Sequence, residues 1–323
     1  MIFLLTPEAN IRVVCTQYFL TERTTKSMFY NTEIYRASMP VLRDDRTHAL
    51  VNILPREGKR LIAKGVLALP EVQRVLNKGW FIVSRGITPS YILEELTEQN
   101  YDTANCTAGI VTNGRMASVL EEDRQGPWVF KDGKLNETPA PVALDDFTAK
   151  DISIKGANAL DMEGNIGVFA ADKAGGTVGG IWPTLTARGA HWIAPVSLER
   201  LIPSVVEAAK HCGNHLWDYT MGQAAGFMPV VNATVVTEIQ ALEILTGVTA
   251  VHVGSGGVAG SEGAVILALE GEKEIVLEAF ELVESIKGEP QFDPPRLIPY
   301  VREPETAPSK KSVDVESGET VEW

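Results

Sequence analysis

The sequence predicts an α/β protein with a Rossmann-like open, mostly parallel sheet that has helices on both faces, together with a smaller α+β unit. The first observation is an apolar run at 80–83, typical of a buried strand, which is followed by a glycine turn and a helical pattern over 91–97. The second is a glycine run at 175–180 that leads into a helical segment ending at Gly189. Strand, glycine turn and helix in this order form half of a βαβ unit.

Apolar periodicity supplies the other elements of the main domain. Leu61, Ile62 and Val66 share one face of a helix predicted over 56–69. An Asp-Gly pair at 132–133 is a hairpin signal after an aromatic strand. The remaining predictions are a helix at 71–78, strands at 107–112, 128–130, 152–154 and 192–194, a loop at 137–141, and a helix at 202–211.

We divide the chain into four parts. They are an N-terminal arm or extension at 1–50, a main α/β domain at 51–231 with a β-rich insertion at about 107–150, a smaller α-β-β-α unit at 232–290, and a tail at 303–323. The smaller unit combines predicted helices at 237–245 and 272–286 with strands at 249–253 and 264–269. The tail is rich in Pro, Ser, Glu and Lys, and we expect it to be disordered.

Charge narrows the possible partners. The chain has 42 acidic and 29 basic residues, a formal net charge of −13. Such a surface repels phosphate backbones and anionic membranes, so we expect neither nucleic-acid nor membrane binding. A small anionic metabolite is still compatible, because backbone N–H groups can hold an anion locally. No apolar stretch is long enough for a membrane span or a signal peptide, and we expect a cytoplasmic homo-oligomer.

The cysteines and histidines give no sign of a metal or a cofactor. Cys15, Cys106 and Cys212 are odd in number and lack a C-x-x-C spacing, which argues against a disulfide framework or a zinc site. We expect them to be small buried hydrophobic residues in a reducing compartment. The five histidines show no metal-ligand spacing.

The first glycine loop joins the predicted strand at 80–83 to a helix. Its candidate ligand-binding residues are Ser84, Arg85, Gly86 and Thr88. A strand-to-helix junction points free N–H groups and the positive helix end at whatever lies there, and Arg85 adds a fixed charge. The alternative is an ordinary tight turn with a capped helix.

The second loop has the candidate ligand-binding residues Lys173, Gly175, Gly176 and Thr177. Glycine pairs let the backbone approach a ligand closely, and Lys173 could neutralise a phosphate. The alternative is close packing of a helix on the sheet. A third cluster at 254–260 follows a strand, but a second strand follows it in turn, which argues against a dinucleotide-binding fingerprint.

Several motifs between residues 154 and 197 form a recognisable set. They are Ile-Lys-Gly-Ala-Asn-Ala-Leu-Asp at 154–161, Gly-Asn at 164–165, a lysine and glycines at 173–180, Arg-Gly at 188–189, and Ile-Ala-Pro-Val-Ser at 193–197. Together they resemble segments of the ribose-5-phosphate isomerase and CoA-transferase-like superfamily, including its initiation-factor-2B-like isomerases. The resemblance covers about residues 55–215, and it implies that 84–88 is a phosphate loop and that Asn158 contacts the ligand.

The same resemblance leaves the reaction open. The superfamily's acids fall at Lys155 and Asn158, so that Asp161 alone keeps a carboxylate. A sugar-phosphate isomerase needs a general base, for which Asp161 or Lys155 is the candidate. A CoA-transferase uses a glutamate nucleophile, for which Glu262 is the candidate. A third possibility is a non-catalytic metabolite-binding or regulatory protein that kept the ligand site and lost the acid.

Overall fold

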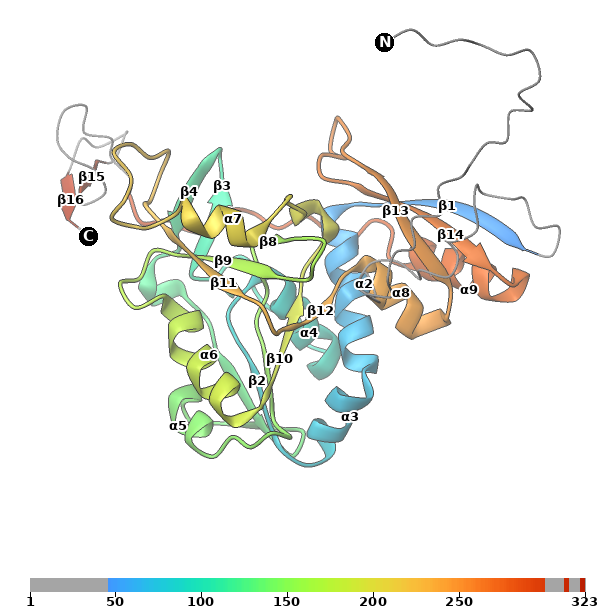
Figure 1. Cartoon of the computed structure of the whole chain (residues 1–323), viewed down its shortest axis with the longest axis horizontal. Helices are drawn as coiled ribbons and strands as arrows, with labels where there is room; N and C mark the ends of the chain where they lie inside the picture. Colours follow the sequence, from blue (N-terminus) through green and yellow to red (C-terminus); the bar gives the residue numbers. More distant parts are fainter. Residues whose placement is uncertain (1–45, 300–310, 314–319, 323) are drawn as a thin grey trace, which may run out of the picture.

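The computed structural model describes residues 46–299, 311–313 and 320–322, which form a mixed α/β fold (Figure 1). Two 3-10 helices and eight α-helices occur within these residues. In chain order the elements are β1 (Thr47–Ile53), α2 (Pro55–Ala68), α3 (Pro70–Asn77), β2 (Trp80–Val83), α4 (Ile87–Thr97), β3 (Gly109–Thr112), β4 (Arg115–Ser118), η1 (Glu121–Asp123), β5 (Trp128–Lys131), β6 (Lys134–Asn136), α5 (Ala140–Asp145), β7 (Ile152–Ile154), β8 (Ala159–Leu160), β9 (Ile166–Ala170), α6 (Gly176–Arg188), β10 (His191–Pro195), η2 (Leu198–Arg200), α7 (Val205–Lys210), β11 (Gly226–Val230), β12 (Thr234–Val236), α8 (Glu238–Thr246), β13 (Thr249–Ser255), β14 (Val265–Gly271), α9 (Lys273–Ser285), β15 (Lys311–Val313) and β16 (Thr320–Glu322).

A six-stranded mixed sheet forms the centre, with the order β12-β10-β7-β2-β5-β6. The first four strands pair in parallel, which confirms the strands predicted around 80–83, 152–154 and 192–194. The β5–β6 hairpin pairs antiparallel with β2, so part of the predicted β-rich insertion extends the main sheet. Its turn residues, Asp132 and Gly133, both have positive φ, as a two-residue hairpin turn of this kind requires.

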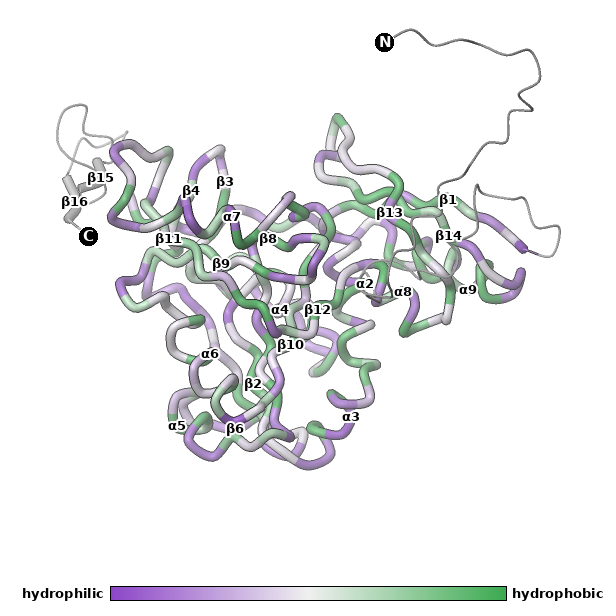
Figure 2. The backbone as a smooth tube through the Cα atoms, in the orientation of Figure 1, coloured by the Kyte–Doolittle hydropathy of each residue, from purple (hydrophilic) through white to green (hydrophobic). Residues whose placement is uncertain are grey.

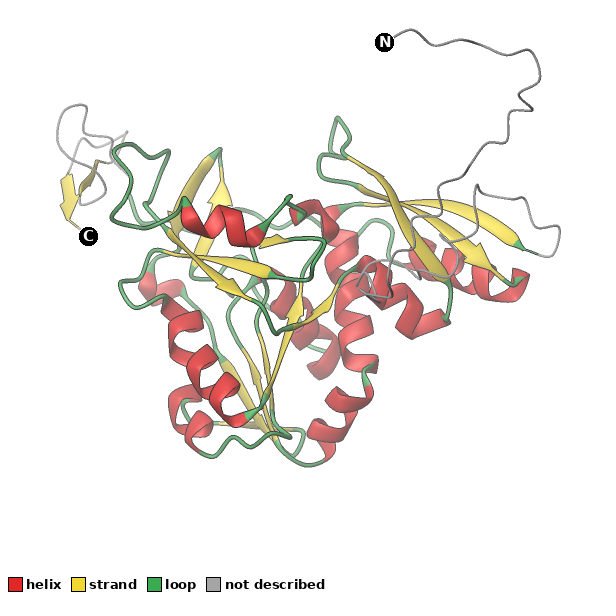
Figure 3. Ribbon diagram, in the orientation of Figure 1, coloured by secondary structure: helices red, strands yellow, loops and turns green. Residues whose placement is uncertain are grey.

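Helices cover both faces of this sheet: α5 and α6 lie on one side, and α2, α3 and α4 on the other (Figures 1 and 3). The helix α2 buries Leu61, Ile62 and Val66 completely, as its periodicity predicts. Each fully buried side chain of this size contributes about 1.5–3 kcal/mol to folding. Along the chain, the segment around β2 is mainly hydrophobic, whereas peripheral turns are hydrophilic (Figure 2).

A second sheet has the order β1-β14-β13, with α8 and α9 packed against it, and contains the helices and strands predicted between 237 and 286. The sequence does not predict β1, which pairs antiparallel with β14 over its whole length. Gly65 lets this unit pack closely on α2, because a Cβ at this position would lie 2.7 Å from the Cα of Ala241 in α8. The α2 helix therefore contacts β10 and β12 of the central sheet and the helix α8 that packs on the second sheet.

Three boundaries differ from the predictions. The helix α4 begins at Ile87 rather than at 91, so that the loop before it is shorter. A short helix, α5, replaces the end of the predicted loop at 137–141. The helix α7 is shorter than the predicted 202–211, because the Ser204 hydroxyl accepts a hydrogen bond from the N–H of Glu207 and caps the helix there.

Two predicted parts of the chain fall mostly outside the described residues. The arm at 1–50, including Cys15, is described only from residue 46, where the chain leads into β1. Within the predicted tail at 303–323, the structure describes β15 and β16, which pair antiparallel with each other. Among the described residues, no helix is both long enough and apolar enough to cross a membrane.

The elements that cover the sheet are joined by a charged cluster around Arg60 of α2. Its guanidinium forms ion pairs with Glu94 (2.5 Å) and Glu95 (3.0 Å) of α4 and with Glu289 (2.7 Å) after α9. It also lies over the ring of Tyr91, 4.6 Å from the centroid. The Arg60 side chain is only 16% exposed, so these contacts are only weakly screened by water.

We expect Arg60→Met to lower the free energy of unfolding by about 2–4 kcal/mol, because three half-buried carboxylates lose their common cation. Urea denaturation measures the change. The matched control is Lys210→Met, which removes an exposed ion pair with Glu207 and should cost less than about 1 kcal/mol. Equal effects of the two substitutions would contradict this assignment.

Candidate functional site

A cavity of about 1210 Å³ lies where the parallel strands β2, β7 and β10 end. Arg85 and Gly86 line it from the loop after β2, Lys155 from the loop after β7, and Arg200 from the segment after β10. Parallel strands present their carboxyl ends at one edge of the sheet, so these three loops meet there although they are distant in sequence. The β3–β4 hairpin, the β8–β9 segment and residues 290–298 complete the walls.

The cavity lining is positively charged in a protein that is acidic as a whole. Seven cationic side chains line it, against three carboxylates, whereas the full chain has a net charge of −13. The cations are Arg56, Lys59, Arg85, Arg124, Lys155, Lys173 and Arg200, and the carboxylates are Asp172, Glu199 and Glu262. Charge of one sign in a concave site focuses the field there and attracts ligands of the opposite sign.

Four of these cations are positioned by backbone carbonyl groups. Arg85 donates to the carbonyl of Gln125 (3.0 Å), and Arg124 to that of Val119 (2.9 Å). Lys155 donates to the carbonyl of Arg85 (3.0 Å), and Arg200 to that of Ala157 (2.8 Å). A carbonyl fixes the direction of the side chain without neutralising it, so Arg85 and Arg124 keep their charge for a ligand. The charge of Arg200 is partly offset by Glu199, 3.7 Å away.

The first glycine loop reaches the cavity in part. Arg85, Gly86 and Thr88 line it, whereas Ser84 is buried and its N–H continues the sheet by donating to the carbonyl of Ile154 (2.9 Å). No side chain caps α4. The N–H of Gly86 donates to the carbonyl of Cys106 (2.7 Å), so the N–H groups of Ile87 and Thr88 are the ones open to a ligand or water. Burial, assisted by the nearby charge of Arg124, lowers the pKa of Arg85.

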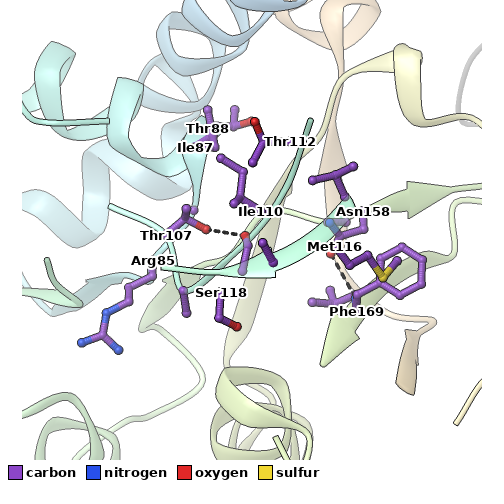
Figure 4. Close-up of a pocket in the computed structure, with 18 of the residues that line it drawn as sticks. Arg85, Ile87, Thr88, Thr107, Ile110, Thr112, Met116, Ser118, Asn158 and Phe169 are labelled. Carbon is purple, nitrogen blue, oxygen red and sulfur yellow. Dashed lines mark hydrogen bonds between the residues drawn. The ribbon is translucent and has the colours of Figure 1, made fainter. Parts of the chain in front are cut away.

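The loop after β7 brings an amine and an amide to the cavity. Lys155 is half-buried and forms no ion pair with the described residues. Burial, together with the charge of Arg200, lowers the pKa of Lys155 to about 8. The Asn158 Oδ1 accepts a hydrogen bond from the N–H of Phe169 (3.0 Å), which leaves its amide NH₂ without a partner in the described part of the chain (Figure 4).

The second glycine loop lines the cavity with Lys173, Gly175, Gly176 and Thr177. The structure adds a residue that the sequence reasoning missed: Asp172 Oδ1 accepts the N–H groups of Ala174 (2.8 Å) and Gly176 (3.1 Å). These hydrogen bonds lower the pKa of Asp172. A carboxylate of the chain itself thus occupies part of the helix start that was expected to hold a ligand.

Gly179 packs against its own loop. A Cβ on Gly179 would lie 1.8 Å from the carbonyl oxygen of Ala174, so this position tolerates no side chain, whereas a Cβ on Gly180 would meet nothing within 4 Å. Gly179 and Gly180 do not belong to the cavity lining. Neither glycine provides the close contact between helix and sheet that the alternative expected, and only the beginning of the run faces the cavity.

Asp161 lies outside the cavity lining. It is buried, and its carboxylate accepts the N–H groups of Glu163 (3.1 Å), Asn165 (3.0 Å) and Val205 (2.9 Å), and the amide of Asn165 (3.1 Å). These bonds hold the turn at 161–165 and connect it to the start of α7. The geometry gives Asp161 a structural role, as a turn-forming aspartate.

Glu262 lines the cavity from the loop between β13 and β14. Its side chain is exposed, and Oε2 accepts the N–H of Gly260 (2.9 Å). The glycine cluster at 254–260 connects two antiparallel strands, as predicted, and does not lead into a helix. It therefore lacks the context of a dinucleotide-binding fingerprint.

Sequence reasoning missed Arg56, Lys59, Arg124 and Arg200. They come from α2, η2 and the segment after η1, and no spacing in the sequence connects them with the glycine loops. Two of them pair with Glu199, Lys59 at 2.9 Å and Arg200 at the longer distance of 3.7 Å. The Nε atom of Arg56 is buried without a hydrogen-bond partner in the described residues, so it is a further donor at the cavity wall.

The cavity lining combines charged side chains with apolar ones. Figure 4 shows Arg85 on one side of the pocket and Asn158, Met116 and Phe169 on the other, with Ile110 of the β3–β4 hairpin between them. Residues 290–298 add Phe292 and Ile298 to the apolar wall. A ligand with an anionic group and a less polar body suits such a surface.

Among the described residues, the cysteines and the metal-binding residue types form no second site. Burial raises the pKa of Cys106 to about 12, which keeps it a thiol and agrees with the expected buried hydrophobic role. Cys212 is half-buried, and burial raises its pKa too. Within the described residues, no group of three or more His, Cys, Asp and Glu side chains could hold a metal ion.

We expect Asp161→Asn to lower the free energy of unfolding by about 1.5–3 kcal/mol, since a neutral amide replaces a charged acceptor of buried N–H groups. The dissociation constant for inorganic phosphate should change less than about threefold, as a structural role predicts. Chemical denaturation and isothermal titration calorimetry measure the two quantities, with Asp218→Asn as an exposed control. An unchanged stability combined with lost phosphate binding would instead place Asp161 in the ligand site.

No protein-family model, no curated protein and no solved structure matches this chain. The charge of the cavity and the placement of its loops are therefore the observations on which a function can be proposed.

Proposed function

We propose that the cavity binds a small anionic metabolite, one that carries a phosphate group. The observation that carries this proposal is the excess of cations in the lining of a strongly acidic protein, seven against three. Arg85, Arg124 and Lys155 are held by backbone carbonyls and form no ion pair among the described residues, whereas Arg200 also lies 3.7 Å from Glu199. Charge-assisted hydrogen bonds from such groups to phosphate oxygens are among the strongest in proteins.

The geometry supports a ligand of moderate size. The phosphate would lie at the start of α4, where Thr88 presents an uncapped N–H group and Arg85 is near. Ligand cavities typically measure about 300–1000 Å³, so a volume of about 1210 Å³ leaves room for an organic body beside the anion. Arg200 and the free amide of Asn158 are placed to contact that body.

We also propose the finer fold assignment, a Rossmann-like member of the ribose-5-phosphate isomerase and CoA-transferase-like superfamily. Its support is that the loops carrying the resemblance, at 84–88, 155–158 and 173–177, line one cavity at the carboxyl ends of parallel strands. A cytoplasmic location and a homo-oligomeric state belong to the same proposal. Both rest on the sequence features given above.

As an enzyme, the protein would act like a sugar-phosphate isomerase. The required base has to lie in the cavity, which Asp161 does not. Asp172 is engaged as a cap and Glu199 is paired with Lys59, so neither is free to take a proton. Lys155 has a lowered pKa and no carboxylate partner in the described residues, and it is the better placed candidate.

A second candidate is acyl transfer, favoured by the position of Glu262 in the same cavity without an ion pair among the described residues. The carboxylate would attack the thioester carbon, the carbon–sulfur bond would break, and CoA would leave as the thiolate. The test is release of one thiol per chain from acetyl-CoA, with an acyl adduct mapped to Glu262. Thiol release that persists in Glu262→Gln would exclude this residue as the nucleophile.

Thermal unfolding with inorganic phosphate, sugar phosphates and acyl-CoAs tests the proposal. A ligand at 100 times its dissociation constant should add about 2.7 kcal/mol to stability, which raises the melting temperature measurably. Arg85→Met and Arg200→Met should each weaken phosphate binding by about 10- to 100-fold, because each loses a charge-assisted hydrogen bond. Lys173→Ala should weaken it as well.

Lys210→Met removes an exposed cation outside the cavity and is the matched control. No shift with any anion, or a shift that survives both arginine substitutions, would contradict the proposal. A large rise in melting temperature with a sugar phosphate, without turnover of that compound, would favour the regulatory alternative, in which the site binds its ligand but catalyses no reaction.

A further inference from the structure

Three lysines line the cavity, and they differ in what surrounds the amine. Lys59 is bound to Glu199 and to the carbonyl of Pro55. Lys173 is exposed to solvent. Lys155 is half-buried, and its Nζ donates to one described group, the carbonyl oxygen of Arg85 at 3.0 Å. No other lysine of the cavity combines shielding from solvent with the lack of a described carboxylate partner.

The backbone holds Lys155 in a fixed place. Its N–H donates to the carbonyl of Ile193 (3.1 Å), and its carbonyl accepts the indole N–H of Trp192 (3.1 Å). Both partners belong to β10, the neighbour of β7 in the sheet. The residue thus follows the end of a central parallel strand, and its amine is directed by a rigid element, as a reacting group requires.

The charges around the amine favour its neutral form. Arg200 contributes a positive charge, and burial removes solvent, so that the pKa of Lys155 falls to about 8. No described carboxylate pairs with it to restore the ammonium form. A lysine that is neutral near physiological pH has a free electron pair and can act as a nucleophile.

We propose that Lys155 is an amine nucleophile that forms an imine with the carbonyl group of an anionic aldehyde or ketone bound in the cavity. This deepens the proposed function and rests on it, because the cations of the cavity would hold the anionic end of the substrate. The carbonyl oxygen of Arg85 accepts a hydrogen bond from the Lys155 amine, and Arg200 lies near enough to influence the charge of that amine.

The step is balanced as follows. The electron pair of the neutral amine attacks the carbonyl carbon and forms a carbon–nitrogen bond, while the carbonyl π electrons move to oxygen. The oxygen takes up the proton that nitrogen loses, which gives a carbinolamine. The hydroxyl group then leaves as water together with the second proton of the nitrogen, and the nitrogen electron pair forms the C=N bond. Amine and carbonyl compound have become imine and water, with no oxidant or reductant required.

Reductive trapping tests this assignment on the full chain. The protein is incubated with glyceraldehyde 3-phosphate and cyanoborohydride, which reduces an imine to a stable secondary amine. We expect one adduct per chain, mapped to Lys155 by tandem mass spectrometry. The initial rate should rise about tenfold per pH unit below pH 8 and level off above it, because only the neutral amine reacts. For a surface lysine, the rate of adduct formation would continue to rise at higher pH.

The controls separate this inference from the proposed function. Lys155→Arg should abolish the adduct, and a cooperative thermal transition shows that the variant is folded. Lys210→Arg, an exposed lysine outside the cavity, should leave the adduct unchanged. An adduct spread over several lysines, or one that persists in Lys155→Arg, would overturn the assignment. If wild-type protein binds inorganic phosphate but gives no adduct at Lys155, the imine proposal is contradicted and the proposed anion site is not. An adduct at Lys155 without phosphate binding would instead contradict the proposed anion site.

Discussion

The parallel pairing of β2, β7 and β10 is the constraint on which the candidate site depends. The pairing continues just beyond the strand ends, where the N–H of Ser84 donates to Ile154 and the N–H of Lys155 donates to Ile193. Each bond fixes the first residues of the loop that follows. Arg85 and Lys155 consequently leave the sheet at the same edge, and Arg200 reaches that edge after β10. The chemistry of the cavity is thus a consequence of strand order and direction.

The electrostatics of the cavity follow from what those loops meet. Carboxylates are abundant in the chain, yet Arg85, Arg124 and Lys155 pair with backbone carbonyls, and Arg200 lies 3.7 Å from Glu199 at its nearest ion-pair contact. Placing cations close together in this way costs free energy through their mutual repulsion, and an anionic ligand would offset that repulsion on binding. In the Arg60 cluster, by contrast, three glutamates surround one arginine, and their ion pairs join α2 to α4 and to the segment after α9.

Much of the fold could be predicted from local patterns, and the parts that could not depend on distant residues. The apolar run at 80–83 and the glycine at 189 gave β2 and the end of α6 correctly, because a buried strand and a helix stop are local signals. The strand β1 was missed, since its pairing with β14 is set by residues far along the chain. Likewise, the glycine loops were visible in the sequence, whereas Arg56 and Arg200 enter the site only through folding. Asp161 shows the reverse. Its motif predicted a catalytic base, whereas its four hydrogen bonds hold the turn at 161–165 and connect it to the start of α7.

The two positions where the family resemblance implies acids are occupied by Lys155 and Asn158, and this difference has an electrostatic consequence. A carboxylate at either position would lie in the same cavity as Arg200 and Arg85 and would neutralise part of their charge. It would also hold a neighbouring lysine in its ammonium form. With an amide and an amine there instead, the excess of the remaining cations is retained, and the amine is the group that we propose as a nucleophile. Under the proposed superfamily assignment, the absence of carboxylates at these two positions does not by itself imply an absence of catalysis, because an amine can bond to a carbonyl carbon where a carboxylate would remove a proton.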